Sequence, residues 1–154
     1  MKRLLPLLLL LAVAPLNAAD HSHEHADAPA MEHRKPITLS AEEKAHIHLE
    51  MRLFLAGTQK IVTGIAANDM KLVTAAASSL GMAAAHEVPA GLRARLPLEF
   101  KKLGQATHQG FDDLARDADS LADANHALRQ LGQVMSNCVS CHAMYRLEAR
   151  AGGK

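Results

Sequence analysis

A chain of 154 residues, of which 49% are hydrophobic and 21% charged, is long enough for one domain with a single core. Its 17 basic and 16 acidic residues almost balance, which argues against a nucleic-acid-binding surface or an anionic membrane surface as its partner. Aromatic residues make up only 3% of the chain, and the abundance of Ala and Leu favours helices over sheets.

The first residues have the pattern of a secretory signal peptide. Lys2 and Arg3 form the charged region, residues 4–16 form the apolar region, and Ala18 ends a small-residue cleavage site. The alternative is a membrane anchor, but the apolar run has about 13 residues and contains two prolines, whereas a spanning helix needs roughly 20 residues. We therefore expect residues 1–18 to export the mature protein to the periplasm, without a stable membrane anchor.

Residues 19–37 are rich in histidine and have no apolar period. The histidines that stand here among acidic and small residues are His21, His23, His25 and His33. Such a composition is typical of a disordered leader. Histidine-rich tracts also bind copper, zinc or nickel, so a metal-handling role for this segment is the alternative to a solvated polar linker.

Two amphipathic helices are predicted after the leader. The first is expected over residues 40–66, because Ser40 and Glu43 have the spacing of a capping box. Its apolar stripe follows steps of three and four and consists of Ile47, Met51, Phe54 or Leu55, Ile61 and Ile65. Asp69 is placed to cap a second helix, over residues 70–86.

Two further helices are predicted in the second half of the chain. The connection that ends at Pro97 contains two prolines and a glycine, which exclude one continuous helix but allow a short helical turn around Leu92. A third helix should begin at or just after Pro97 and end in a turn at 119–123, and a fourth should span 124–148. Four amphipathic helices with mostly short connections predict an all-α fold, an antiparallel four-helix bundle over residues 38–150.

The last predicted helix contains the motif Cys-x-x-Cys-His, formed by Cys138, Cys141 and His142. This is the spacing of c-type haem attachment. On a helix the two sulfurs lie on one face and can reach the two vinyl groups of one porphyrin, while the following imidazole reaches the iron. The chain has only these two cysteines. A disulfide across so short a loop would constrain the unfolded chain little, and no βαβ pattern surrounds the motif as in thioredoxin-like redox sites.

The position of this motif, on the last of four helices and followed by Tyr145 and Arg146, resembles the class II cytochromes c, the cytochrome c prime family. The resemblance covers about residues 40–148. It implies a periplasmic four-helix bundle with one covalent haem, thioether bonds to both cysteines and His142 as the axial ligand of the iron. It also implies Arg146 near a haem propionate, Tyr145 packed beside the attachment segment and, in many members, a homodimer through the first two helices.

The residue that faces the iron opposite His142 would distinguish between two possible functions. In the family it comes from the first helix, and counting back from the turn at Gly64 to the family's distal position leads to Met51. A methionine ligand would suit electron transfer, whereas an apolar residue leaves the iron five-coordinate and open to nitric oxide or carbon monoxide. Met51 as ordinary core filling is the remaining alternative. His108 could approach the haem edge, but the simpler expectation, as for His46 and His48, is a solvated histidine or one that contacts the residues around the iron and not the iron itself.

These inferences together predict an exported monohaem electron carrier that transforms no substrate and is not an enzyme. Its expected cofactor is one covalent haem c, its expected partners are redox proteins, and His142 and Met51 would bind the iron. The expected cofactor-binding residues are Met51, Cys138, Cys141, His142 and Arg146. The sequence departs from the family at one place, because Arg52 does not lie on the face where the family tends to carry an arginine near its distal residue.

Overall fold

A computed structural model of the chain describes residues 32–85 and 88–150. All of these residues belong to one compact unit. The predicted signal peptide, residues 1–18, lies outside the described residues, as does most of the predicted leader.

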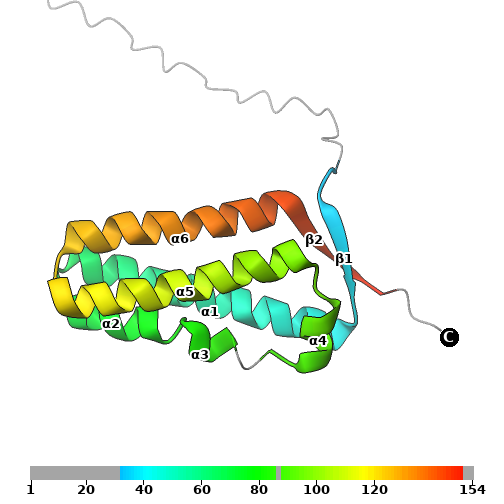
Figure 1. Cartoon of the computed structure of the whole chain (residues 1–154), viewed down its shortest axis with the longest axis horizontal. Coiled ribbons are helices and arrows are strands. Elements are labelled where there is room, and N and C mark those ends of the chain that lie inside the picture. Colours follow the sequence, from blue (N-terminus) through cyan, green and yellow to red (C-terminus); the bar gives the residue numbers. More distant parts are fainter. Residues whose placement is uncertain (1–31, 86–87, 151–154) are drawn as a thin grey trace, which may run out of the picture. The chain divides into compact units, whose positions relative to one another are not determined.

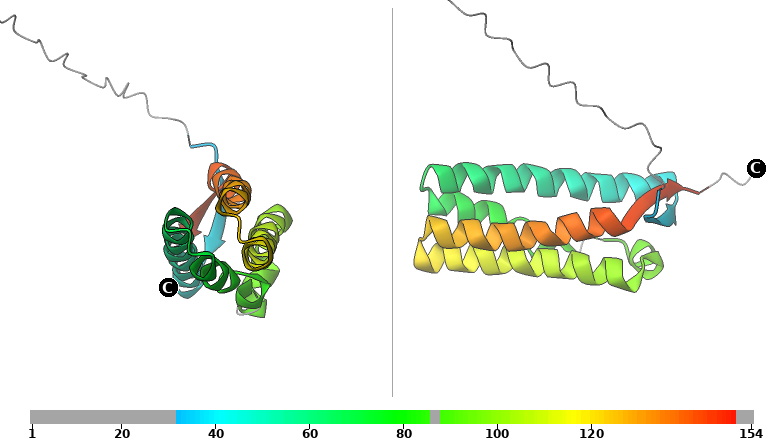
Figure 2. Two further views of the ribbon diagram at one scale, coloured as in Figure 1. Left: turned by 90° about the vertical axis from the view of Figure 1, so that its left-hand side faces the viewer. Right: turned by 90° about the horizontal axis from the view of Figure 1, so that it is seen from above.

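Helices make up most of the described chain, which confirms the all-α class, and two short strands add a small sheet. The elements are β1 (Lys35–Leu39), α1 (Ala41–Ala66), α2 (Met70–Ser78), α3 (Met82–Ala85), α4 (Ala90–Arg95), α5 (Leu98–Leu121), α6 (Ala124–Met144) and β2 (Tyr145–Ala149) (Figure 1). The four longest helices of the described part, α1, α2, α5 and α6, lie side by side (Figure 2). α2 packs against α1 and α5, and α5 packs against α6, whereas α1 and α6 contact each other less extensively.

The expected helix starts at Ser40 and Asp69 are confirmed. The Glu43 amide donates a hydrogen bond to Ser40 Oγ (3.1 Å), and the Ser40 amide donates one to the Glu43 carboxylate (2.9 Å), which completes the capping box. Asp69 Oδ1 accepts a hydrogen bond of 3.0 Å from a backbone amide in the first turn of α2. The predicted helical turn around Leu92 is α4, and α5 begins directly after Pro97.

The second predicted helix is interrupted. α2 ends at Ser78 and the helix resumes as α3 at Met82, while residue 86, its predicted end, lies outside the described residues. Between the two helices, the Asp112 carboxylate of α5 accepts a hydrogen bond from the Met82 amide (2.9 Å). A Cβ at Gly81 would lie 1.8 Å from Asp112 Oδ1, so the missing side chain makes room for that carboxylate. The break therefore depends on a residue 30 positions further along the chain, which local periodicity does not reveal.

α5 extends further than predicted. It continues through part of the expected turn at 119–123 and ends at Leu121. Ala122 follows with a φ of 50°, in the left-handed region, and the Asp123 side chain then caps α6 by accepting a hydrogen bond from the Asn125 amide (2.8 Å). The connection between α5 and α6 is therefore only two residues long.

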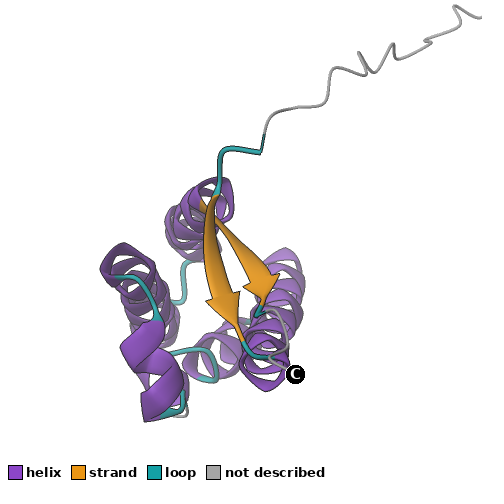
Figure 3. Cartoon of the chain, turned by 90° about the vertical axis from the view of Figure 1, so that its right-hand side faces the viewer, coloured by secondary structure: helices purple, strands orange, loops and turns teal. Residues whose placement is uncertain are grey.

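The fourth helix is shorter than predicted. α6 ends at Met144 instead of continuing to 148, and the chain goes directly into β2. β2 pairs in parallel with β1, with Lys35 opposite Tyr145 at the start of the ladder (Figure 3). The helical period of the sequence includes Tyr145, so pairing with a distant strand overrides the local preference at this point.

The last three residues of the predicted leader, 35–37, belong to β1. Ile37 and Leu39 are buried (4% and 0% exposed) and alternate with exposed residues. This alternation is that of a strand with one face on the core. The prediction that residues 35–37 belong to a disordered leader is therefore wrong. Residues 19–31 of the predicted leader lie outside the described part of the chain.

The core consists of two clusters of buried side chains. The first joins α1, α2, α5 and α6, and its largest fully buried members are Ile61, Val73, Phe111, Leu114 and Leu131. The second joins the two strands to α1, α4 and the segment before α5, and its buried members are Ile37, Leu39, Ile47, Leu92, Leu96 and Tyr145. Along α6, the first cluster reaches Val134 and the second begins at Cys141. The Cys-x-x-Cys-His motif therefore lies where one cluster ends and the other begins.

Candidate functional site

The two cysteines lie one turn apart on α6, and both are half-buried. Cys138 and Cys141 are free thiols. Burial raises the pKa of each thiol, so both are protonated at neutral pH. The Cys138 thiol points back along the helix toward the Val134 carbonyl oxygen, 3.9 Å away. His142, one turn after Cys138, is exposed, so the motif lies at the edge of the core rather than inside it.

Met51 and the motif meet at the second cluster. Met51 on α1 is half-buried and packs against that cluster, and Cys141 packs against the same cluster from α6. The fold therefore brings these two sequence-predicted residues to one part of the molecule, although they lie on its first and last helices.

Met51 belongs to an uncovered apolar side of α1. Leu55 and Val62 follow it at spacings of four and seven residues, which places all three on one side of the helix. Leu55 is 72% exposed and Val62 is 48% exposed. On the opposite side of α1, an added Cβ would overlap the Val73 side chain of α2 at Gly64 and the Leu80 side chain, just after α2, at Gly57. The apolar side thus points away from α2.

α6 has a matching side. Met135, Val139 and His142 follow one another at spacings of four and three, and Met135 and Val139 are 46% and 69% exposed. Gln133 and Asn137, on the opposite side of the helix, line a shallow cavity together with α5 residues. α1 and α6 contact each other less extensively than the other neighbouring long helices do, and each has apolar side chains that stay at least partly exposed on one side. We call these side chains together the α1–α6 seam; they are Met51, Leu55, Val62, Met135 and Val139.

One donor of Arg146 has no partner in the part of the chain that the structure describes. It lies on β2, and its guanidinium pairs with the Glu148 carboxylate. Its Nε is buried and has no hydrogen-bond partner among the described residues. A buried donor left without a partner costs roughly 1–3 kcal/mol, so it is a place where an anionic group would be favourable.

Tyr145 lies against the end of α6. Its amide donates a hydrogen bond to the Cys141 carbonyl oxygen, and its side chain is only 7% exposed. The ring packs edge-on against Phe100 of α5, with 5.6 Å between ring centroids. The tyrosine thus lies beside the motif, as the resemblance implies.

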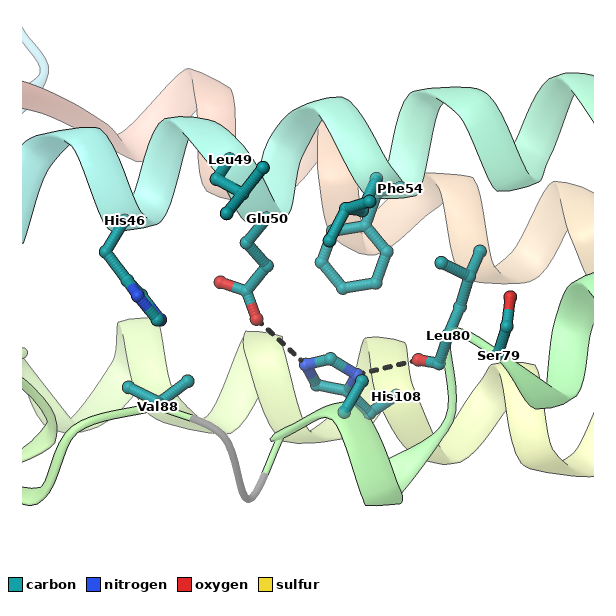
Figure 4. Close-up of a pocket in the computed structure, with 10 residues that line it drawn as sticks. His46, Leu49, Glu50, Phe54, Ser79, Leu80, Val88 and His108 are labelled. Atoms are coloured by element: carbon teal, nitrogen blue, oxygen red, sulfur yellow. Dashed lines mark hydrogen bonds and ion pairs between the residues drawn. The ribbon is translucent and has the colours of Figure 1, made fainter.

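His108 is buried, so of the two positions expected for it the solvated one is wrong. Its side chain contacts two groups, as Figure 4 shows. Nδ1 lies 2.7 Å from the Leu80 carbonyl oxygen and Nε2 lies 3.3 Å from Glu50 Oε1. A carbonyl only accepts, so Nδ1 carries the hydrogen of the first bond. Burial lowers the pKa of His108, but the hydrogen bonds to Glu50 and Leu80 outweigh it, and the pKa lies above its usual value.

A cavity of about 80 Å³ adjoins this histidine. Its polar lining consists of His46, Glu50, Ser79 and His108, and the rest of its wall is apolar. It lies on the side of α1 that faces α2 and α3, and no residue of the Cys-x-x-Cys-His motif lines it. The cavity and the α1–α6 seam are therefore separate features.

The contribution of β1 to the candidate site was not predicted from the sequence. Ile37 and Leu39 belong to the same cluster as Tyr145, against which Met51 and Cys141 pack. The alternation of apolar and polar residues over Lys35–Leu39 was a signal for a strand, but five residues are too few to outweigh the polar composition before them.

Three results concern metal ions, membrane-spanning helices and known relatives. Over the described residues, no three His, Cys, Asp or Glu side chains converge closely enough to hold a metal ion, and the histidine-rich segment 19–31 is outside that part. No helix within the described ranges is long and apolar enough to cross a membrane. Comparisons with protein-family models, curated proteins and solved structures found no match to this chain.

Proposed function

We propose that this protein is an exported monohaem c-type cytochrome that carries electrons, built as an antiparallel four-helix bundle of α1, α2, α5 and α6. Cys138 and Cys141 attach the haem, and His142 binds its iron. The observation that carries the proposal is that Cys141 of this motif and Met51 pack against the same core cluster, from the last and the first of these helices. The resemblance of the motif and its position to class II cytochromes c supports the same function.

The residues of the candidate site suit a haem. A porphyrin is a flat apolar group, and the exposed side chains of Leu55 and Val139 would lose their contact with water against such a group. The free thiols of the motif are available for thioether bonds, and the buried Nε of Arg146, which has no partner among the described residues, suits a propionate. A haem held here would supply one-electron chemistry at its iron. The protein would fix the axial ligands and keep water from the iron, and both effects set the reduction potential.

The covalent attachment is tested by removing both cysteines. We expect the full chain, expressed in a bacterium that matures c-type cytochromes, to keep its haem after denaturation and electrophoresis. The double variant Cys138→Ala/Cys141→Ala should keep none, because no thioether bond can form. Ser140→Ala is the matched control, since it changes an exposed residue of the same turn and should keep the haem. A parent chain without covalent haem would contradict the proposal.

The electron-carrier role is tested at Met51. A methionine opposite histidine gives a low-spin iron of raised potential. We expect a low-spin ferric spectrum in the parent and a high-spin spectrum in Met51→Ala, with a lower reduction potential. Met82→Ala, on the short helix α3, should leave both unchanged. A high-spin ferric spectrum in the parent would instead indicate an open distal face, as in the members of the family that bind nitric oxide or carbon monoxide.

A further inference from the structure

The chain changes conformation immediately after the proposed iron ligand. Only Ala143 and Met144 separate His142 from β2, and the C-cap of α6 is already extended, with φ −129° and ψ 150° at Tyr145. The helical spacing of Cys138, Cys141 and Tyr145 would by itself continue α6 by about one more turn. A contact with another part of the chain therefore keeps Tyr145–Ala149 out of the helix.

The parallel partner strand is that external constraint. β1 pairs with β2 along its whole length, and the Arg150 amide adds a hydrogen bond of 2.7 Å to the Leu39 carbonyl oxygen. A single strand has no partner for its backbone groups, so β2 depends on β1. Burial of Ile37 and Leu39 in the cluster that also holds Tyr145 adds to the pairing.

The side chains that would change position are those of the candidate site. In a strand, Tyr145 and Leu147 point to one face and Arg146 to the other, whereas in a helix each residue turns by about 100°. Loss of β2 would take Tyr145 from its place against Phe100 and would move the unpaired Nε of Arg146.

We propose that strand β1 is a positioning element of the haem site: by pairing with β2 it keeps the residues after His142 out of the helix and so holds Arg146 and Tyr145 beside the motif. This inference rests on the proposed function. It assigns the strand before α1, whose first three residues were predicted to belong to the leader, a role in setting the environment of the iron.

The backbone of β1 offers a matched pair of variants. The Leu39 carbonyl faces β2, and backbone groups alternate along a strand, so the amide of Ile37 also faces β2 while those of positions 36 and 38 face away. Position 36 is indeed a proline, which has no amide hydrogen to donate. Ile37→Pro should therefore break the ladder, whereas Thr38→Pro should leave it intact.

The experiment measures amide hydrogen exchange, reduction potential and spin state on the haem-containing protein. In Ile37→Pro we expect exchange in Tyr145–Ala149 to become at least about tenfold faster, a changed reduction potential and a fraction of high-spin iron, with the haem still attached. Thr38→Pro should match the parent in all three. The inference is overturned if Ile37→Pro loses protection of β2 but keeps the parent's potential and spectrum, or if β2 stays protected.

Two further results are informative. If Ile37→Pro does not accumulate, the series Ile37→Val and Ile37→Ala weakens the strand in steps, and the shift in potential must then increase with the exchange rate of β2. If the shift does not follow the exchange rate, β1 has only a structural role. A parent chain without covalent haem would overturn the proposed function itself. The denaturing gel distinguishes this outcome from a failure of the inference about β1, because the gel result does not depend on β1.

Discussion

His108 is a buried polar residue that connects α5 with α1 and with the segment between α2 and α3. It extends from α5 to the Leu80 carbonyl, just after α2, and to Glu50 on α1, and the ring centroids of His108 and Phe54 lie 5.0 Å apart. Because Nδ1 donates to the carbonyl, Nε2 can donate to the Glu50 carboxylate only when the ring is protonated. The contact is therefore an ion pair below the pKa of His108 and a weaker contact above it.

The sign of the resulting pH dependence follows from the raised pKa of His108. A group that binds its proton more tightly in the folded state stabilises the fold below its unfolded pKa, about 6.5 for histidine, and this contribution is lost as the pH rises through the folded value. We expect the free energy of unfolding of the parent to fall as the pH rises above about 6.5. The free energy of unfolding of Glu50→Gln should be lower than that of the parent by roughly 1–3 kcal/mol at pH 6, and it should fall less than that of the parent as the pH rises.

Urea unfolding followed by circular dichroism between pH 5.5 and 8.5 measures this difference. Glu99→Gln, which removes an exposed carboxylate of α5, is the control and should show the pH dependence of the parent. Parallel curves for the parent and Glu50→Gln would show that the pair contributes nothing to the pH dependence.

At the scale of the elements, the interruption between α2 and α3 has one identifiable cause. The Asp112 carboxylate occupies the space above Gly81 and accepts the hydrogen bond of the Met82 amide. The break brings the Leu80 carbonyl to His108, so the two features depend on each other.

Gly81→Ala should therefore destabilise the protein. The new methyl group would displace the Asp112 carboxylate and remove its hydrogen bond to Met82, at a cost of about 1 kcal/mol. Gly91→Ala is the matched control, because a Cβ at that position of α4 meets nothing within 4 Å and should leave stability unchanged or slightly raised. Urea midpoints of the two variants make the comparison, and equal midpoints would rule out the steric role of Gly81.

At the scale of the molecule, local sequence patterns predicted where helices begin. Contacts between residues that are distant in the chain decide the places where the structure differs from those predictions. Ser40, Glu43 and Asp69 act on amides within three residues, so the starts of α1 and α2 could be read from the sequence. The break at Gly81 and the end of α6 depend on partners that are distant in the chain, and no local pattern contains them.

In the candidate site, too, some features could be predicted from local sequence and others depend on tertiary packing. The spacing of Cys138, Cys141 and His142 is local and needs no fold to be recognised. That Met51 packs on the same cluster as Cys141 is a tertiary fact, which the sequence suggested only through the resemblance. The unpaired Nε of Arg146 and the exposed side chains of Leu55 and Val139 could not be predicted at all, because exposure and missing partners are properties of the packed chain.

The burial of Tyr145 has a practical consequence. The chain contains one tyrosine and no tryptophan, so its ultraviolet fluorescence comes almost entirely from this one ring at the junction of α6 and β2. A nearby porphyrin would absorb that emission, and withdrawal of the ring from Phe100 would expose it to soluble quenchers. The fluorescence of Tyr145 therefore reports on the structure at the place where α6 ends, and no added label is needed.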